Sequence, residues 1–272
     1  MNKPSIFAIF IAYNAAKTLR GFYESFPKEL FDEIILVDDA SSDGTYELAK
    51  SLGLRAYRNE VNLGYGGNMK RALSIGLKLG GDVFVDIHPD GEYKPGSIPN
   101  ALEEVHKGAQ LVLGNRFSKW EAPLQSGMYF WKFIPILLLN KLTQLFLQTD
   151  IADAHQGFRV YTRRLLEGNS FERNSNDYLF SFELIAQAVL NRVKISQVAV
   201  ATNYTGKKRG ATLKKSVLYT LGTFKIVGQF WFAKLGIKSK IFDSPKVQLE
   251  TRIISLLPLG PLLSRGNHPP EN

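Results

Sequence analysis

The stretch DVFVDIHPDGEYKP, residues 82–95, decides how the chain is organised. It begins with a largely apolar run, Val83 to Ile87, whose composition is typical of a strand buried in a parallel sheet. It ends with His88, Asp90 and Glu92, which are spaced two residues apart. In an extended chain this spacing puts side chains on one side of the backbone, so we expect the three groups to converge at the carboxyl end of a strand. Open α/β sheets bind their ligands at that end.

Two carboxylates and an imidazole suit a divalent cation. We expect Mg²⁺ or Mn²⁺ to be held by Asp90, Glu92 and His88, because such ions combine protein ligands with the phosphate oxygens of a substrate. Pro-Asp-Gly is also a common turn tripeptide, so a polar turn without a metal is the alternative. These residues alone favour neither interpretation.

Strand and helix signals alternate on both sides of this stretch. This alternation predicts an α/β fold, with a mostly parallel sheet wound by right-handed crossovers and flanked by helices. We expect one domain over residues 1–205, with a nucleotide-binding half to about 116 and a second half from about 117. Besides the strand after residue 82, the expected strands are 5–13, 33–38, 55–58, 110–114, 157–162 and 194–201. The expected helices are 15–25, one ending near 51, one from the 62–68 segment to 79, 97–107 and 178–190.

Two further polar turns follow expected strands. Ala12-Tyr13-Asn14 follows the first strand, and Asp38-Asp39 follows the second. We expect both turns to bind a nucleoside, because carboxylates accept hydrogen bonds from base N–H groups and ribose hydroxyls, and because amides at a helix start face outward. Aspartates are also common helix caps, which is the alternative for Asp38 and Asp39.

The composition favours an anionic partner. The net charge is +9, from 34 Lys and Arg against 25 Asp and Glu, which suits a nucleotide, a nucleic acid or an acidic membrane surface. The absence of cysteine excludes disulfides and thiolate metal sites. The apolar start of the chain is short and lacks a cleavage site of small residues, which favours a buried strand over a signal peptide. No uninterrupted apolar stretch reaches about 18 residues, which argues against a conventional transmembrane helix.

Two later segments could contact a membrane. Residues 129–148 are apolar with their polar residues on one helical face, which is typical of an amphipathic surface helix and equally of a core helix. Residues 203–240 contain nine basic residues and no acidic one, interleaved with aromatics. We expect basic amphipathic helices over 206–242 on anionic lipid, with a solvated basic face or a nucleic-acid groove as alternatives. Residues 243–272 are expected to be a peripheral tail.

Six motifs together resemble a known family. In order and spacing they are similar to the family-2 glycosyltransferases of GT-A fold, in particular the dolichyl-phosphate mannosyltransferase and polyprenyl-phosphate glycosyltransferase branch. The motifs are AYN (12–14), VDDASSDGT (37–45), NLGYGGNMKRAL (62–73), HPDGEYKPGSIP (88–99), LGNRF (113–117) and DAHQGFRVYTRR (153–164). The resemblance implies a UDP- or GDP-sugar donor, a divalent metal, inversion at the anomeric carbon and a polyprenyl phosphate acceptor. It also implies a cytoplasmic protein at the inner face of the membrane, in peripheral contact with anionic lipid and without a nucleic-acid partner.

The resemblance assigns roles by position. Asp90 matches the second aspartate of the metal motif, and Glu92 falls where the family often has Gln. Arg116 matches an arginine near the donor and acceptor phosphates, and Lys132 falls where a further basic residue is common. The implied nucleoside contacts are Ala12, Tyr13, Asn14, Asp38 and Asp39, and the basic cluster expected to orient the acceptor contains Lys207 and Arg209.

The metal motif departs from the family pattern. The usual Asp-x-Asp is His88-Pro89-Asp90, so an imidazole replaces one carboxylate. A neutral histidine can ligate Mn²⁺ but brings no negative charge, so we expect weaker Mg²⁺ binding. Asp86 either compensates for the lost carboxylate or faces the sheet.

The acceptor determines whether a base is needed. A polyprenyl phosphate is already anionic, whereas a hydroxyl must lose a proton, for which Asp153 is the candidate base and His155 the second choice. The alternatives are a glycosyltransferase acting on a saccharide or protein hydroxyl, a non-catalytic nucleotide-sugar binding protein, and a sugar-phosphate nucleotidyltransferase. The last would need a Gly-rich phosphate loop after the first strand, where the chain has AYNAAK.

Overall fold

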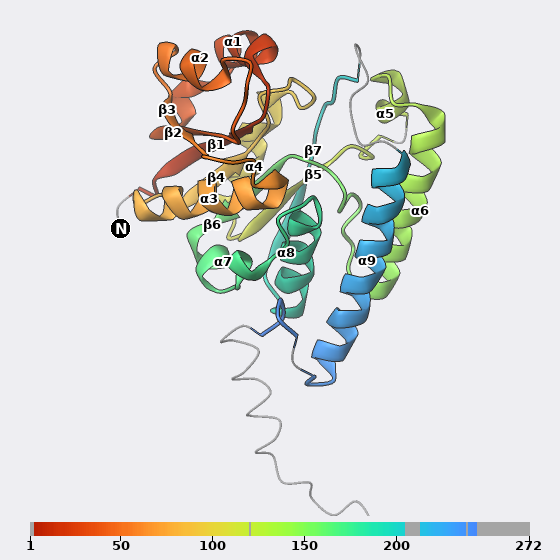
Figure 1. The fold of residues 1–272 in the computed structure, drawn as a ribbon. Helices are drawn as coiled ribbons and strands as arrows, with labels where there is room; N and C mark the ends of the chain where they lie inside the picture. The colour runs from red at the N-terminus through yellow and green to blue at the C-terminus, as the bar shows by residue number, and fades with distance from the viewer. Residues whose placement is uncertain (1–2, 120, 205–212, 238, 244–272) are drawn as a thin grey trace, which may run out of the picture.

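The computed structural model describes residues 3–119, 121–204, 213–237 and 239–243 (Figure 1). Its centre is one seven-stranded sheet with the strand order β3-β2-β1-β4-β6-β5-β7. The α/β fold predicted from the sequence is confirmed. The strands are β1 (Ile6–Ala12), β2 (Glu33–Asp38), β3 (Arg55–Arg58), β4 (Val83–Asp86), β5 (Leu111–Asn115), β6 (Arg159–Thr162) and β7 (Ile195–Ala199).

Helices cover both faces of the sheet (Figure 1). They are α1 (Ala16–Glu24), α2 (Thr45–Ser51), α3 (Gly64–Lys78), α4 (Ile98–His106), α5 (Ala122–Gln125), α6 (Phe130–Leu147), α7 (Arg163–Glu167), α8 (Leu179–Leu190) and α9 (Leu213–Lys234). Alternate residues of a strand face opposite sides of a sheet. In β1, Ile6, Ala8 and Phe10 therefore pack with α1, α2 and α4, while Phe7 and Ile9 pack with α3 and α8.

Strand β6 runs against its neighbours. It lies between β4 and β5 and is antiparallel to both, whereas the other strand pairs are parallel. The sequence predicted a mostly parallel sheet but not this reversal. The residue types of a buried strand are compatible with either direction, so the sequence pattern of β6 does not reveal which way it runs. β6 and β7 come from the second half of the chain and complete the sheet begun by the first half.

Helices α6 and α9 lie side by side at one flank of the molecule (Figure 1). Their contacts include a hydrogen bond from Trp231 Nε1 to the Phe146 carbonyl, at 3.0 Å, and one from Lys234 Nζ to Gln148 Oε1, at 2.6 Å. Within the described parts of the chain, α6 is the one helix that is long and apolar enough to cross a membrane by length and composition. Core helices of soluble proteins pass the same test.

The buried side of α6 contains both apolar and polar residues, and its outer side exposes several large apolar side chains. Asn140 and Thr143 are buried against the protein, whereas Leu138 and Leu145 point outward and are 60% and 68% exposed. The sequence placed the polar residues of 129–148 on one helical face and left open whether the helix lies on the surface or in the core. In the structure Lys141 is exposed, whereas Asn140 and Thr143 face inward, where they have hydrogen-bond partners.

Candidate functional site

The carboxyl ends of four parallel strands bring the predicted site residues to one edge of the sheet. β1, β2, β4 and β5 all run in the same direction, so the segments that follow them share this edge. Those segments carry Tyr13 and Asn14, Asp39, Asp90 and Arg116. The loops, rather than the strands, therefore set the local geometry.

The first two turns bind each other. The Asn14 amide donates to Ser41 Oγ at 2.8 Å, and the Ser42 amide donates to Asn14 Oδ1 at 3.1 Å. The Ala15 amide at the start of α1 donates to Thr45 Oγ1, also at 2.8 Å. These amides do not face outward as the sequence led us to expect, because the neighbouring turn already satisfies them.

Asp38 and Asp39 are both buried. Asp39 Oδ1 accepts from Asn59 Nδ2 at 2.6 Å, and its Oδ2 accepts from the Gly64 amide at 3.0 Å, so this carboxylate stabilises the start of α3. Asp38 Oδ2 accepts from the Ser41 amide at 3.1 Å, whereas its Oδ1 has no hydrogen-bond partner in the described chain. Asp38 Oδ1 is therefore the acceptor at this turn that remains unsatisfied.

The other predicted nucleoside contacts differ in exposure. Ala12 is buried at the end of β1, whereas Asn14 is exposed and Tyr13 is 58% exposed. Asn14 has a positive φ of 51°, a conformation that asparagine tolerates better than most residues. The turn therefore presents the Tyr13 ring and the Asn14 side chain to solvent at the rim of the sheet.

The loop after β4 does not continue as a strand. β4 ends at Asp86, Gly91 has a positive φ of 72°, and Asp90 Oδ1 accepts from the Glu92 amide at 2.8 Å, which closes a turn. The expectation that His88, Asp90 and Glu92 share one side of an extended segment is therefore wrong. In the described ranges, no group of three His, Asp or Glu side chains is arranged to hold a metal ion.

His88 lies against the sheet rather than beside Asp90. Its Nε2 is 3.5 Å from Asp86 Oδ1, and its ring contacts Tyr65 edge-on at 5.6 Å between centroids. Burial opposes the charged ring, but the negative charge of the nearby Asp86 outweighs it and raises the pKa of His88. The ring is thus directed toward Asp86 and Tyr65.

Asp86 faces the sheet, which decides the alternative left open by the sequence. It is fully buried, accepts a hydrogen bond from Tyr161 Oη at 3.3 Å and lies 4.0 Å from Arg159 Nη1. Arg159 Nη1 also donates to Tyr65 Oη at 3.4 Å. The arginine of the Gly-Phe-Arg segment therefore pairs with Asp86 inside the protein, and Asp86 does not compensate for the missing metal carboxylate.

The carboxylates that remain for a cation are Asp90 and Glu92. Both are partly exposed on the loop at the carboxyl edge. Magnesium sites in proteins are usually built from one or two carboxylates plus waters and substrate phosphates. The two residues therefore fit a metal that is shared with a diphosphate and do not fit an all-protein metal cage.

Arg116 is held in a buried ion pair. Its Nε donates to Asp153 Oδ2 at 2.7 Å and its Nη2 to Asp153 Oδ1 at 2.8 Å, which is a bidentate geometry. Its Nη1 donates to Tyr204 Oη at 3.0 Å. Burial favours protonation of Asp153, but the charge and hydrogen bonds of Arg116 prevail and lower its pKa. Asp153 is thus a fixed anion that orients Arg116, and this geometry does not support its predicted role as a base.

His155 is equally unsuited to take a proton. Its Nε2 is 3.1 Å from Thr143 Oγ1 and its Nδ1 is 2.8 Å from Tyr219 Oη, so both ring nitrogens are engaged. Burial lowers its pKa to about 3, and the positive charges of Arg116 and Arg159 oppose protonation further.

Backbone pairing ties the loop that carries Asp90 and Glu92 to the Arg116 region. The Asn203 amide donates to the Glu92 carbonyl at 2.8 Å, and the Lys94 amide donates to the Ala201 carbonyl at 3.1 Å. This pairing places Tyr204 beside Arg116. The role of Tyr204 was not predicted, because only the tertiary contact identifies it.

Of the remaining predicted basic residues, the structure describes Lys132. Lys132 belongs to α6, where its ammonium lies 5.1 Å from the centre of the Trp131 ring. Lys207 and Arg209 fall outside the described residues.

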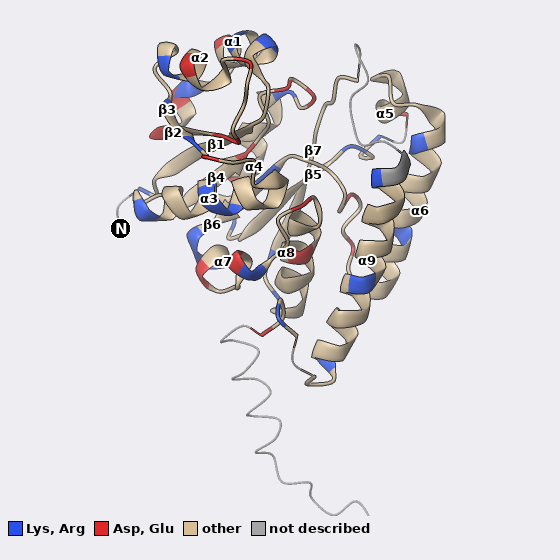
Figure 2. Ribbon diagram, viewed as in Figure 1, with Lys and Arg blue, Asp and Glu red and all other residues tan. Residues whose placement is uncertain are grey.

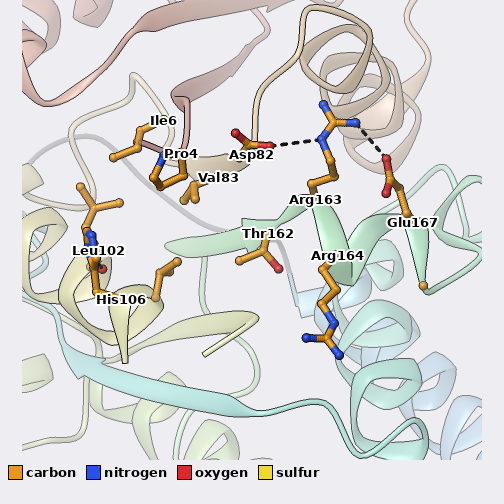
Figure 3. A pocket seen from close by; sticks show the side chains of 12 residues that line it. Pro4, Ile6, Asp82, Val83, Leu102, His106, Thr162, Arg163, Arg164 and Glu167 are labelled. Atoms are coloured by element: carbon orange, nitrogen blue, oxygen red, sulfur yellow. Dashed lines mark hydrogen bonds and ion pairs between the residues drawn. The ribbon is translucent and has the colours of Figure 1, made fainter. Parts of the chain in front are cut away.

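A separate groove of about 760 Å³ lies at the opposite edge of the sheet (Figure 3). Pro4 and Ile6 at the start of β1, and Val83 at the start of β4, line it. Arg163 contributes ion pairs to Asp82, at 3.5 Å, and to Glu167, at 2.8 Å. Its position at the amino ends of these strands separates it from the candidate site.

Comparison with known proteins identifies the family of this chain. The model of "Glycosyl transferase family 2" matches residues 7–169, which is more than half of the chain. A UDP-N-acetylglucosamine–dolichyl-phosphate N-acetylglucosaminyltransferase of Methanococcus voltae is 26% identical over 74% of this chain and 86% of its own length. A polyprenol monophosphomannose synthase of Mycolicibacterium smegmatis is 25% identical over 76% of this chain and 77% of its own.

Solved structures confirm the GT-A fold. Glucosyl-3-phosphoglycerate synthase of Mycobacterium tuberculosis, solved with UDP, has a TM-score of 0.65 and 18% identity, and the match covers 87% of this chain and 82% of the other. The same enzyme has been solved with Mn²⁺, UDP and its product, with a TM-score of 0.62. The sheet, the motif order and the family match lead to one conclusion: the chain belongs to glycosyl transferase family 2 and is a glycosyltransferase.

Proposed function

We propose that the enzyme transfers a sugar, with inversion, from a UDP- or GDP-sugar to a polyprenyl phosphate and requires Mg²⁺ or Mn²⁺. The observation that carries this proposal is the fixed guanidinium of Arg116 beside the loop that carries Asp90 and Glu92. Asp153 and Tyr204 hold three of its nitrogens, and one N–H of Nη1 has no partner within the described residues. Arginine in such a rigid setting suits phosphate recognition.

The relatives support the acceptor class. The Methanococcus voltae and Mycolicibacterium smegmatis proteins are named for transfer to dolichyl phosphate and for synthesis of polyprenol monophosphomannose. An anionic acceptor also agrees with a site in which Asp153 and His155 are both engaged and neither is placed to accept a proton. A hydroxyl acceptor would need such a base.

The reaction that these residues support needs no proton transfer. An acceptor phosphate oxygen bonds to the anomeric carbon from the face opposite the donor diphosphate, the bond from that carbon to the diphosphate breaks, and the nucleoside diphosphate leaves. Asp90 and Glu92 would hold the metal, which neutralises charge on the leaving diphosphate when bound. Arg116 orients the acceptor phosphate, and Asp153 keeps Arg116 in place.

We also infer that α6 and α9 rest on the cytoplasmic face of an anionic membrane. Their outer sides expose Leu138 (60%), Leu145 (68%) and Leu221 (61%), among other large apolar residues. Neither helix contains Asp or Glu, and both carry lysines (Figure 2). Apolar side chains next to lysines without acidic neighbours suit an interface that is apolar inside and negatively charged at its surface.

Transfer by the purified protein tests the enzymatic proposal. Radiolabelled UDP- and GDP-sugars are incubated with anionic vesicles containing polyprenyl phosphate, with Mn²⁺ or with a chelator, and the products are extracted into organic solvent. We expect metal-dependent label in the organic phase that mild acid releases. Label on saccharide or protein in the aqueous phase would establish a hydroxyl acceptor instead. Binding of donor without transfer to any acceptor would favour a non-catalytic protein.

Vesicle flotation tests the membrane contact. Burying one leucine side chain in an apolar environment contributes roughly 1.5–3 kcal/mol of binding free energy. Replacing both Leu138 and Leu145 with Glu removes two such contributions, so the partition coefficient of the protein onto anionic vesicles should fall at least about tenfold. Leu79→Glu is the control, because Leu79 is also exposed but ends α3, away from α6 and α9. Equal flotation of the double variant and the control would contradict this inference.

A further inference from the structure

His155 joins three helices to the loop that holds Arg116. Its Nε2 is 3.1 Å from Thr143 Oγ1 of α6, and its Nδ1 is 2.8 Å from Tyr219 Oη of α9. Its ring stacks on Phe182 of α8, with 5.2 Å between the centroids and 25° between the planes. One side chain therefore contacts all three helices that pack at this flank.

The chemistry of the ring matches this bridging position. Burial lowers the pKa of His155 to about 3, so the ring is neutral at physiological pH and has one donor and one acceptor nitrogen. Hydroxyl groups can serve as donor or acceptor, so Thr143 and Tyr219 can satisfy both nitrogens at once.

The backbone of the same segment leads directly to Arg116. The His155 carbonyl accepts a hydrogen bond from Arg116 Nη2 at 3.0 Å. The Ala154 amide donates to Asn140 Oδ1 at 3.1 Å, which adds a second tie to α6 close to Thr143. A shift of α6 or α9 therefore moves the segment that fixes the guanidinium.

We propose that His155 is a positioning residue. When α6 and α9 bind to a lipid surface, their positions determine the orientation of Arg116 through the contacts of His155. This inference rests on the proposed function and adds to it a mechanism by which the enzyme acts on acceptors in membranes. The outer sides of the same helices are the apolar ones, since Leu138 on α6 and Val217 and Leu221 on α9 are at least half exposed. Contact at the outer side and hydrogen bonding at the inner side thus involve the same two helices.

Kinetics in two acceptor formats test the link. His155→Phe keeps the stacking on Phe182 and removes both ring hydrogen bonds, while Tyr219→Phe removes one hydroxyl. With polyprenyl phosphate in anionic vesicles we expect each variant to raise the acceptor KM about 5- to 20-fold, with an unchanged donor KM. With a short-chain, water-soluble prenyl phosphate and no vesicles, the variants should match the wild type within about twofold, because no lipid surface positions the helices.

A double variant and a matched control make the test specific. His155→Phe combined with Tyr219→Phe should be no worse than His155→Phe alone, because both changes break one link. Thr220→Val is the control, since the Thr220 hydroxyl bonds within α9 to the Ser216 carbonyl and has no part in the link. Equal losses in both acceptor formats, or effects that multiply in the double variant, would overturn the proposal.

Hydrogen exchange separates this inference from the proposed function. Anionic vesicles without acceptor should slow exchange of the amides of 113–117 in the wild type and in Thr220→Val, but not in His155→Phe. If no sugar is transferred to any polyprenyl phosphate, the proposed function fails, and the exchange result still decides whether the link exists. Identical slowing in His155→Phe and in the wild type would show that His155 transmits nothing.

Discussion

Replacing Asp153 with Asn should lower the free energy of unfolding strongly, although the side chain keeps almost the same shape. Asp153 is fully buried and its two oxygens accept from Nε, Nη2 and the backbone amide of Arg116, at 2.7, 2.8 and 3.1 Å. The substitution leaves the Arg116 guanidinium buried without its counter-charge, which typically costs about 3–5 kcal/mol. Domains of this kind are stable by only about 5–15 kcal/mol, so the loss is a large share of the total.

Urea unfolding followed by circular dichroism measures the effect. The companion variant, Arg116→Gln with Asp153→Asn, removes both charges and should recover stability to within about 2 kcal/mol of the wild type, because a neutral pair leaves no unpaired ion. It should remain inactive if Arg116 orients the acceptor phosphate as proposed. A free energy of unfolding for Asp153→Asn within about 1 kcal/mol of the wild type would refute the argument that Asp153 is the fixed partner of Arg116.

Three further outcomes are expected. Asp90→Asn should fold normally and lower the transfer rate at saturating donor at least about 100-fold, measured as initial velocity over a range of Mn²⁺ concentrations. Gly66→Ala should cost roughly 1–3 kcal/mol in thermal or urea unfolding, because its Cβ would collide with the Ser175 carbonyl oxygen, whereas Gly21→Ala in α1 meets nothing within 4 Å and should cost nothing. The buried His155 takes up a proton only near pH 3, while the unfolded chain does so below about pH 6.5, so acidification favours unfolding. From pH 7 to pH 5 the wild type should therefore lose about 2 kcal/mol more than His155→Phe, as the pH dependence of urea midpoints would show.

Most strands were predictable because each is an apolar run followed by turn residues. β2 and β3 have the predicted bounds, and β1 differs by one residue at each end. The strand in the deciding stretch was extended too far in the prediction. It ends at Asp86, because Pro89 and Gly91 turn the chain and Asp90 caps the turn.

The site was predictable in outline but not in its pairings. The motifs place Asp90 and Arg116 at one edge of the sheet, since they follow parallel strands. The partner of Arg116 is 37 residues away in the chain, and the pairing depends on how α6 and the segment after it fold back. The inward direction of His88 is likewise set by Asp86 and Tyr65, which only the folded protein brings together.

The sequence also did not predict which side of α6 faces outward, because this depends on tertiary contacts. Its periodicity shows polar residues on one face, and a surface helix normally exposes that face. The polar atoms of Asn140 and Thr143 instead form hydrogen bonds with the segment from Asp153 to His155, and Leu138 and Leu145 face outward. Which side of a helix is buried depends on partners that a local pattern does not contain.

A comparison of two acceptors in the same vesicles tests the central claim most directly. Polyprenyl phosphate and the free polyprenol of the same chain length are offered separately to the purified enzyme with its nucleotide-sugar donor and Mn²⁺. If Arg116 holds the acceptor phosphate as proposed, and since the side chains of Asp153 and His155 are both engaged in other contacts, we predict transfer to the phosphate at least about 100-fold faster than to the alcohol. Comparable or faster transfer to the alcohol would contradict the account.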